Sequence, residues 1–182
     1  LLRLSRNCEV KSMSSEKWFD DYAETIYSYI LLLVRNTHVA EDLTQETFMK
    51  VVANEHQFKG KSSVRTWIFR IAYTTTMSYF RKNKPQTQYQ DTLRLDSTSG
   101  LSAEEVRLQN SQQEQFYDAL SFLKPSYRQV ITLRKIKGFS TKETASILKC
   151  SEGRVKMTLS RALTAFKKEL EKGGFSNETL FQ

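Results

Sequence analysis

Apolar residues recur at steps of three and four along most of the chain, which is the spacing of amphipathic helices. In the first such segment, residues 16–35, one stripe should face a core: Phe19, Tyr22, Ala23, Ile26, Ile30 and Val34. After a break at 36–38, a second helix is expected at about 39–54, with inward positions Leu43, Phe48, Val51 and Val52. A third helix over 64–81, which Ser62 or Ser63 can cap, has the apolar positions Trp67, Ile68, Ile71 and Ala72.

The second half of the chain carries explicit helix start and stop signals. Capping boxes at Ser102–Glu105 and Ser140–Glu143 predict helices over about 104–122 and from 140 to Lys149. Between them, Pro125 stands in the first turn of a helix expected over 125–137, which Gly138 ends. Ser151 caps a long final helix that stops before Gly173.

The helical spacing is interrupted once, at Pro85, and residues 85–101 have the composition of a flexible linker. The pattern therefore predicts an all-α protein of two small helical domains, residues 16–84 and 102–173. Met13 precedes a clear helix start, so residues 1–15 are interpreted as an upstream extension without fixed structure. Residues 174–182 are interpreted as a C-terminal tail.

The last two helices have the spacing of a helix-turn-helix, here residues 140–167, whose second helix enters the major groove of DNA. Its apolar positions are Ala145, Ile147 and Leu148, followed by Val155, Leu159, Ala162 and Phe166. The opposite face of the second helix would present six residues to base edges and phosphates: Arg154, Lys156, Met157, Thr158, Ser160 and Arg161. A helical hairpin with merely solvated cations has the same pattern.

Charge strengthens the nucleic-acid interpretation. The net charge is +8, and residues 58–84 hold seven basic side chains and no acidic one. A second basic block, residues 114–172, has thirteen bases and six acids. Two basic blocks separated by a linker predict two DNA-facing surfaces.

Recognisable catalytic or metal-binding patterns are missing from the sequence. The cysteines at 8 and 150 form no CxxC, and the histidines at 38 and 56 have no ligand spacing with them. We therefore expect no cofactor, no metal and no small-molecule substrate, and a cytoplasmic location. The longest strongly apolar run is six residues, far short of a membrane span, and the N-terminus has no signal-peptide pattern.

The motifs together resemble the sigma-70 family of RNA polymerase sigma factors. Residues 138–148, 151–156 and 161–162 resemble region 4, and residues 123–134 resemble its first half. Residues 40–48 resemble region 2.2, whereas 58–63, 66–67, 71–72 and 81–82 resemble regions 2.3 and 2.4. With only a linker between the two regions, the order is that of the extracytoplasmic-function (ECF) group.

The resemblance assigns roles to residues of the first domain. It implies that the β′ coiled coil of polymerase core contacts the outer face of the second helix, at Glu41, Asp42, Gln45, Glu46 and Met49. It also implies that the following loop and helix hold a flipped base and the rest of the minus-ten element, through Phe58, Lys59, Gly60, Lys61, Ser62, Ser63, Arg65, Trp67, Arg70, Thr74, Ser78, Arg81 and Lys82. Trp67 fits either a core position or a base-stacking platform.

In the second domain, the resemblance implies minus-thirty-five contacts from Arg134 and Ser151 besides the six residues above, and binding to the β flap. Family members are often inhibited by an anti-sigma factor in the membrane, so such a partner is also expected. The chain departs from the family pattern at Thr74 and Ser78, where Asn and Asp are common. It departs again at Arg154 and Met157, which implies an altered minus-thirty-five preference.

Two rival functions remain open at this point. A helix-turn-helix regulator that binds duplex DNA as a dimer would need a dimer interface and a palindromic site. The first domain shows no coiled-coil heptads, and its basic block suits such an interface poorly. An enzyme would need a converging nucleophile and base, or a metal cluster, which the motifs do not provide.

Overall fold

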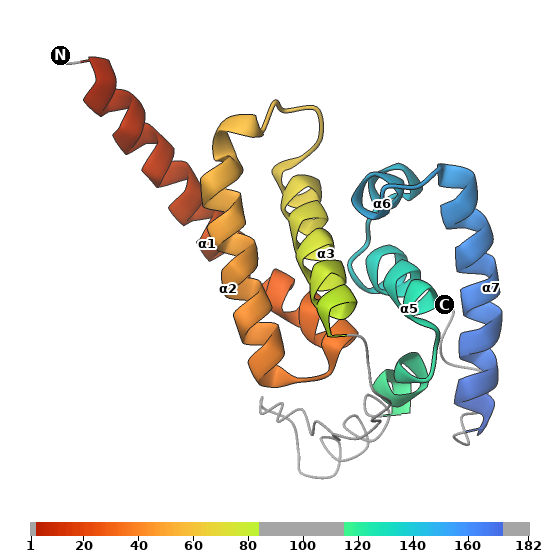
Figure 1. Ribbon diagram of the computed structural model, residues 1–182. Coiled ribbons are helices and arrows are strands. Elements are labelled where there is room, and N and C mark those ends of the chain that lie inside the picture. Colours follow the sequence, from red (N-terminus) through yellow and green to blue (C-terminus); the bar gives the residue numbers. More distant parts are fainter. Residues whose placement is uncertain (1–2, 84–114, 173–182) are drawn as a thin grey trace, which may run out of the picture. The chain divides into compact units, whose positions relative to one another are not determined.

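The structure is a computed structural model that describes residues 3–83 and 115–172, with side chains from Glu16 onward. Every regular element in these ranges is helical, so the expected all-α class is confirmed. The described residues form two compact units, one that contains α1 to α3 and one that contains most of residues 115–172, α5 and α7 included (Figure 1). The expected linker 85–101, the capping box at 102–105, most of the helix at 104–122 and the tail 174–182 lie outside the described residues.

The N-terminal unit packs three helices, α1 (Arg3–Val34), α2 (Thr37–Asn54) and α3 (Val64–Lys82), with a short 3-10 turn η1 (Glu55–Gln57) before the loop to α3. Each helix contacts the other two. Their apolar stripes meet in one core that includes Ile26, Ile30, Leu43, Phe48, Val51, Ile68, Phe69 and Ala72. Asn36 caps α2 by accepting a hydrogen bond from the Val39 backbone N–H at 2.9 Å, which explains the break predicted there.

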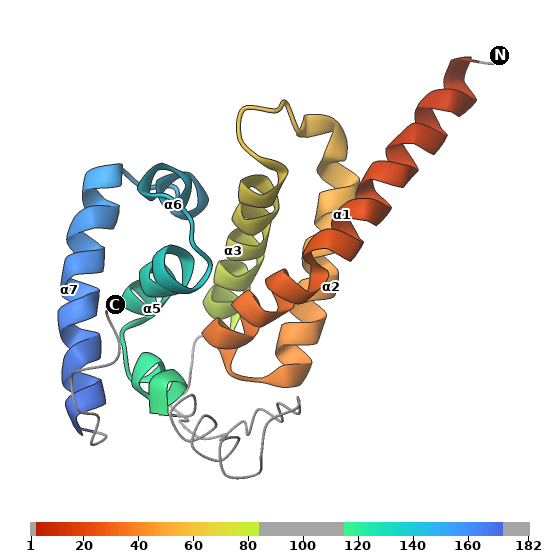
Figure 2. The ribbon, with the colours of Figure 1, turned by 180° about the vertical axis from the view of Figure 1, so that it is seen from behind.

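Two features of this unit differ from the sequence prediction. Helix α1 begins at Arg3 and not near residue 16, so the segment expected to lack fixed structure has helical backbone that extends past α2 and α3 (Figure 2). Residues 3–34 contain neither Gly nor Pro, so nothing local stops the helix. Val52, expected inward, is 56% exposed. The buried stripe of α2 runs through Val51, and the next residue, about 100° further around the helix, faces solvent.

Tyr29 is fully buried against Phe69, with ring centroids 5.1 Å apart. Its hydroxyl has no hydrogen-bond partner within the part of the chain that the structure describes. Burial, with a smaller contribution from Tyr73, raises the pKa of the Tyr29 phenol far above its usual range. The group therefore stays neutral in the folded state at any ordinary pH.

We expect Tyr29→Phe to stabilise the N-terminal unit by about 1 kcal/mol near neutral pH, because it removes a desolvated hydroxyl. In the wild type, the unfolded phenol ionises near pH 10 while the folded one keeps its proton, so stability is present below that pH and is lost above it. The variant should lose less stability between about pH 9 and 11. Urea unfolding measures both effects, with the half-buried Tyr27→Phe as control; equal pH slopes in wild type and Tyr29→Phe would contradict the assignment.

The C-terminal unit contains helical residues 115–121, α5 (Pro125–Ile131), η2 (Thr132–Ile136), α6 (Thr141–Leu148) and α7 (Glu152–Lys172). Helix α5 packs on α7 around a core that includes Leu120, Val130, Leu133, Phe139, Val155 and Phe166. The second predicted capping box is confirmed: Ser140 N–H donates to Glu143 at 2.9 Å and Glu143 N–H donates to the Ser140 hydroxyl at 3.2 Å. Ser151 caps α7 by accepting from the Arg154 N–H at 3.2 Å.

The helix expected over 125–137 is not one α-helix, because its second half, η2, is a π-helical turn. Lys137 N–H donates to the Thr132 carbonyl at 2.8 Å, five residues back, and Gly138 with φ +71° ends the segment. Such wide turns are rare and redirect the side chains that they contain. None of the described helices is both long enough and apolar enough to cross a bilayer.

Candidate nucleic-acid and partner surfaces

The outer face of α2 presents all five residues expected there, Glu41, Asp42, Gln45, Glu46 and Met49, as exposed side chains. They alternate with the buried positions of the same helix, so a partner can reach them together. Met49 is 71% exposed and Val52 is 56% exposed, which places an apolar pair beside the acids. Lys50 lies at the edge of this set: it donates to Glu46 at 2.6 Å and to the Thr75 hydroxyl of α3 at 3.1 Å.

The loop between η1 and α3 is held at both ends. At its start, Phe58 N–H donates to the Glu55 carbonyl at 3.0 Å. At its end, the Ser63 hydroxyl caps α3 by accepting from Thr66 N–H at 3.1 Å, which selects Ser63 over Ser62 as the cap. Gly60 lies between them with φ +67°, a conformation that glycine adopts at low cost. Lys59, Lys61 and Ser62 are exposed on this loop.

Three half-buried aromatic rings meet beside the loop, and we call Trp18, Phe58 and Trp67 the aromatic cluster. The Phe58 and Trp67 centroids are 5.3 Å apart, and Trp18 lies 5.9 Å from each of them. The contacts are edge-on or tilted, an arrangement that aromatic pairs favour. Trp67 is thus neither fully buried nor isolated on the surface, and its partners come from α1 and the loop.

Trp18 is not part of the apolar stripe predicted for the first helix. It stands four residues before Tyr22 and eight before Ile26, so the helical spacing of the first stripe extends back to it. Phe19, a member of the predicted stripe, is 48% exposed, although its ring contacts Phe48 with centroids 4.9 Å apart. Near residue 18, the buried stripe of α1 is therefore shifted by about one residue from the predicted stripe.

The other residues of α3 expected to contact the minus-ten element follow one another along the helix. The basic residues Arg70, Arg81 and Lys82 are exposed, as is Thr74, and Ser78 is half-buried. The two positions that depart from the family pattern are hydrogen-bonded within the helix: Thr74 donates to the Arg70 carbonyl at 2.8 Å, and Ser78 accepts from Arg81 at 3.0 Å. Arg65 instead lies over the Phe69 ring at 5.7 Å, as a cation–π contact.

Helices α6 and α7 form the predicted helix-turn-helix, with Lys149 at φ +53° in the turn. Five of the six expected recognition residues are exposed (Arg154, Lys156, Met157, Ser160 and Arg161), and Thr158 is half-buried. The cap residue Ser151 is exposed as well. Because Val155, Ala162 and Phe166 are buried, the basic face of α7 is turned away from the core.

Arg134 is placed differently from the other residues expected to bind DNA. Its side chain is half-buried in η2 and its guanidinium donates to the Phe139 carbonyl. The π-helical turn directs the side chain to this backbone acceptor, so Arg134 braces the segment before α6 in this structure. Across residues 16–83 and 115–172, no group of three or more His, Cys, Asp and Glu side chains could hold a metal ion.

Both units of the chain are similar to known protein families. The family model "Sigma-70 region 2" matches residues 18–86, and "Sigma-70, region 4" matches residues 113–166. The ECF RNA polymerase sigma factor SigX of Bacillus subtilis is 33% identical over 84% of this chain and 81% of its own length. The ECF RNA polymerase sigma factor SigM of the same organism is 29% identical over 88% of this chain and 98% of its own length.

Two solved structures share the fold. One is the sigma factor RpoE of Bartonella quintana in complex with the anti-sigma factor NepR, with a TM-score of 0.68, 23% identity and coverage of 86% of this chain and 96% of that chain. The other is CnrH in complex with the cytosolic domain of CnrY, with a TM-score of 0.65, 19% identity and coverage of 88% and 90%. The helical arrangement of the chain is therefore one that proteins with different sequences adopt.

Proposed function

The chain belongs to the ECF group of the sigma-70 family of RNA polymerase sigma factors, and from that premise we propose which of its surfaces performs each part of promoter recognition. As a sigma factor, it directs core polymerase to promoters and initiates transcription there. We assign core docking and minus-ten recognition to residues 16–84, minus-thirty-five recognition to residues 102–173, and the connection to residues 85–101. RNA synthesis itself is left to the polymerase, so this chain has no catalytic step.

The observation that carries the assignment is the separation of charge within the N-terminal unit. The exposed face of α2 combines four polar or acidic side chains with the apolar Met49, whereas residues 58–83 contain no acid. DNA would be repelled by the first surface and attracted by the second. The α2 face thus suits the β′ coiled coil, with Met49 and Val52 as its apolar part and the acids beside them as its polar part.

The loop and the aromatic cluster suit the flipped base of the minus-ten element. Stacking of a base on an aromatic ring contributes about 1–3 kcal/mol and tolerates any base, so neighbouring hydrogen-bonding groups must supply selectivity. Here Phe58 and Trp67 offer partly exposed rings, and Lys59, Lys61 and Ser62 are exposed on the loop beside them. In this proposal Trp18 holds Phe58 and Trp67 from the α1 side and thereby positions the loop.

We expect Trp18→Ala to reduce promoter opening by about tenfold, the equivalent of about 1.4 kcal/mol, because Phe58 and Trp67 lose their support. Affinity for core polymerase should stay unchanged, since α2 is not altered. Permanganate reactivity of unpaired thymines measures opening, and a fluorescence titration measures core affinity. Phe19→Ala is the matched control: it removes an adjacent α1 aromatic that contacts Phe48 and not the loop. Equal opening by the two variants would contradict a positioning role for Trp18.

In the C-terminal unit, the proposal assigns minus-thirty-five contacts to the exposed face of α7. Arg154 and Lys156 stand in the first turns, where residues of such a helix reach base edges and phosphates. Met157 and Thr158 can contact thymine methyl groups. Arg134 is assigned a bracing role through Phe139 in place of the direct DNA contact expected from the resemblance.

Run-off transcription with core polymerase, with and without this chain, tests the proposal over a library of genomic fragments. We expect transcripts only when the chain is present, and little binding of the chain alone to the same fragments. A dimeric regulator would show the opposite pattern, with tight binding to duplex DNA and no need for core. Membership of the sigma-70 family disfavours that alternative.

An anti-sigma partner is also proposed. Support comes from the two similar structures above, in which each sigma factor is bound to another protein, described as an anti-sigma factor for RpoE and as the CnrY cytosolic domain for CnrH. We further propose that the chain acts in the cytoplasm, where its polymerase is. Adding the purified cytosolic domain of a candidate anti-sigma factor should abolish run-off transcription and block the binding of this chain to core polymerase. Transcription that survives a saturating amount would exclude that candidate as an inhibitor of this chain.

A further inference from the structure

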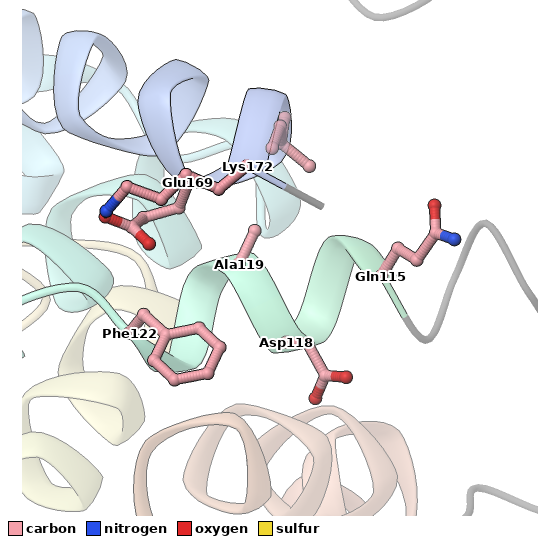
Figure 3. Close-up of a pocket in the computed structure, with 7 residues that line it drawn as sticks. Gln115, Asp118, Ala119, Phe122, Glu169 and Lys172 are labelled. Carbon is pink, nitrogen blue, oxygen red and sulfur yellow. The ribbon is translucent and has the colours of Figure 1, made fainter. Parts of the chain in front are cut away.

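The C-terminal unit has an apolar hollow of about 370 Å³ at the far end of α7 from the recognition residues. Its walls come from the helix at 115–121, from Phe122 and from the last turns of α7. Figure 3 shows Ala119 directed toward the end of α7, with Phe122 one turn further along its helix. Phe122 is 61% exposed although it lies beside the buried Leu170 and Ala119, so a large aromatic side chain borders this hollow without being covered.

The hollow is large enough for an aromatic side chain, since a cavity of about 150 Å³ already accepts benzene. Two of its polar lining side chains are already paired with each other, because Lys172 donates to Glu169 at 2.7 Å. The occupant therefore needs an apolar side chain and no strong charge. It also needs access to the end of α7, because Lys172 is one of the lining residues.

We propose that the residues following Lys172 fold back and seat Phe175 in this hollow, against Phe122 and Leu170. Phe175 is three residues beyond Lys172, a reach of at most about 10 Å. The two residues between them are Gly173 and Gly174, which permit a sharp reversal directly after the helix. The segment is otherwise mostly polar, so Phe175 is its first apolar residue and the one nearest to the hollow.

Seating Phe175 would join the end of α7 to the helix at 115–121 and cover Phe122. The recognition residues lie near the start of α7, so the contact leaves the DNA-facing surface free. This contact concerns the packing of the C-terminal unit. It does not depend on which unit recognises which promoter element. A second copy of the chain or a partner helix could also cover an apolar patch, and the experiment below distinguishes these occupants.

Nuclear magnetic resonance of the isotope-labelled full chain tests the proposal. We expect nuclear Overhauser contacts between the Phe175 ring and the methyl groups of Ala119 and Leu170. Ending the chain at Lys172, or changing Phe175→Ala, should shift those methyl resonances, whereas the matched control Ser176→Ala should not. In a double-mutant cycle of Phe122→Ala with Phe175→Ala, the second change should have a several-fold smaller effect on the unfolding equilibrium once the first is present.

Three results would overturn the proposal. Unchanged methyl resonances in the shortened chain would mean that the hollow is open. Resonances that shift with protein concentration would assign the hollow to a second copy. Contacts made by Leu180 and Phe181 in place of Phe175, seen as a response to Leu180→Ala with Phe181→Ala and none to Phe175→Ala, would assign it to a different part of the tail.

Discussion

Replacing Lys156 and Arg161 with alanine is expected to weaken promoter binding by the polymerase complex by about 30-fold or more. Both side chains are exposed on the face of α7 turned away from the core, and each contact to a base or phosphate that is lost costs roughly 1–3 kcal/mol. The salt dependence should fall as well: the slope of log affinity against log salt should decrease by about 2 if both contact phosphates. Filter binding over a salt series measures both quantities.

Lys168→Ala is the matched control for this change. It removes one positive charge from the same helix, at an exposed position about two turns beyond Arg161, the last recognition residue. We expect promoter affinity close to wild type for this variant, and core affinity close to wild type for all of them. A loss of core binding in the double variant equal to its loss of promoter binding would contradict the assignment of α7 to DNA.

Changing Met49→Glu is expected to lower affinity for core polymerase by about 2 kcal/mol or more, roughly 30-fold, and to abolish run-off transcription at low protein concentration. Met49 projects from the α2 face next to the acidic residues, with Val52 beside it, so a partner that covers the acids also covers this apolar pair. A carboxylate placed within that interface would lose its water without gaining a partner. Titration of core with fluorescently labelled chain measures the change.

Met49→Leu separates this effect from a general disturbance of α2. Leucine keeps the apolar character and nearly the volume of methionine, so core affinity should remain within about threefold of wild type, which is less than 1 kcal/mol. Circular dichroism should show the same helix content in both variants, because position 49 is exposed. Equal core affinity of the Glu and Leu variants would place the interface elsewhere on the unit.

Much of the fold follows from local signals that the sequence contains in full. Ser140, Glu143 and Ser151 predict helix starts because their side chains satisfy backbone N–H groups only three residues away, and these bonds are present. The recognition face of α7 follows from the spacing of Val155, Ala162 and Phe166, which are buried. A period of 3.6 residues separates the two faces of a helix without knowledge of any partner.

Other features depend on contacts between residues distant in the sequence. Helical spacing could not show that Trp18 on α1 meets Phe58 and Trp67, because that contact requires the packing of α1 against α3. Val52 and Val51 are equally apolar, and only the position of α3 and α1 around α2 leaves one exposed and the other buried. The π-helical turn at η2 is a local feature instead, and helical spacing did not predict that it places the Arg134 guanidinium against the Phe139 carbonyl five residues on.

Local patterns in the sequence are sufficient to predict that this protein is all-helical, which face of each principal helix is polar, and which motifs relate it to sigma factors. Those properties are set by neighbours within about one helical turn and by the order of residues along the chain. Only the folded molecule shows which aromatic residues form the cluster beside the loop and where Phe122 borders an apolar hollow. These depend on how helices pack, and packing joins residues whose separation in the sequence carries no periodic signal.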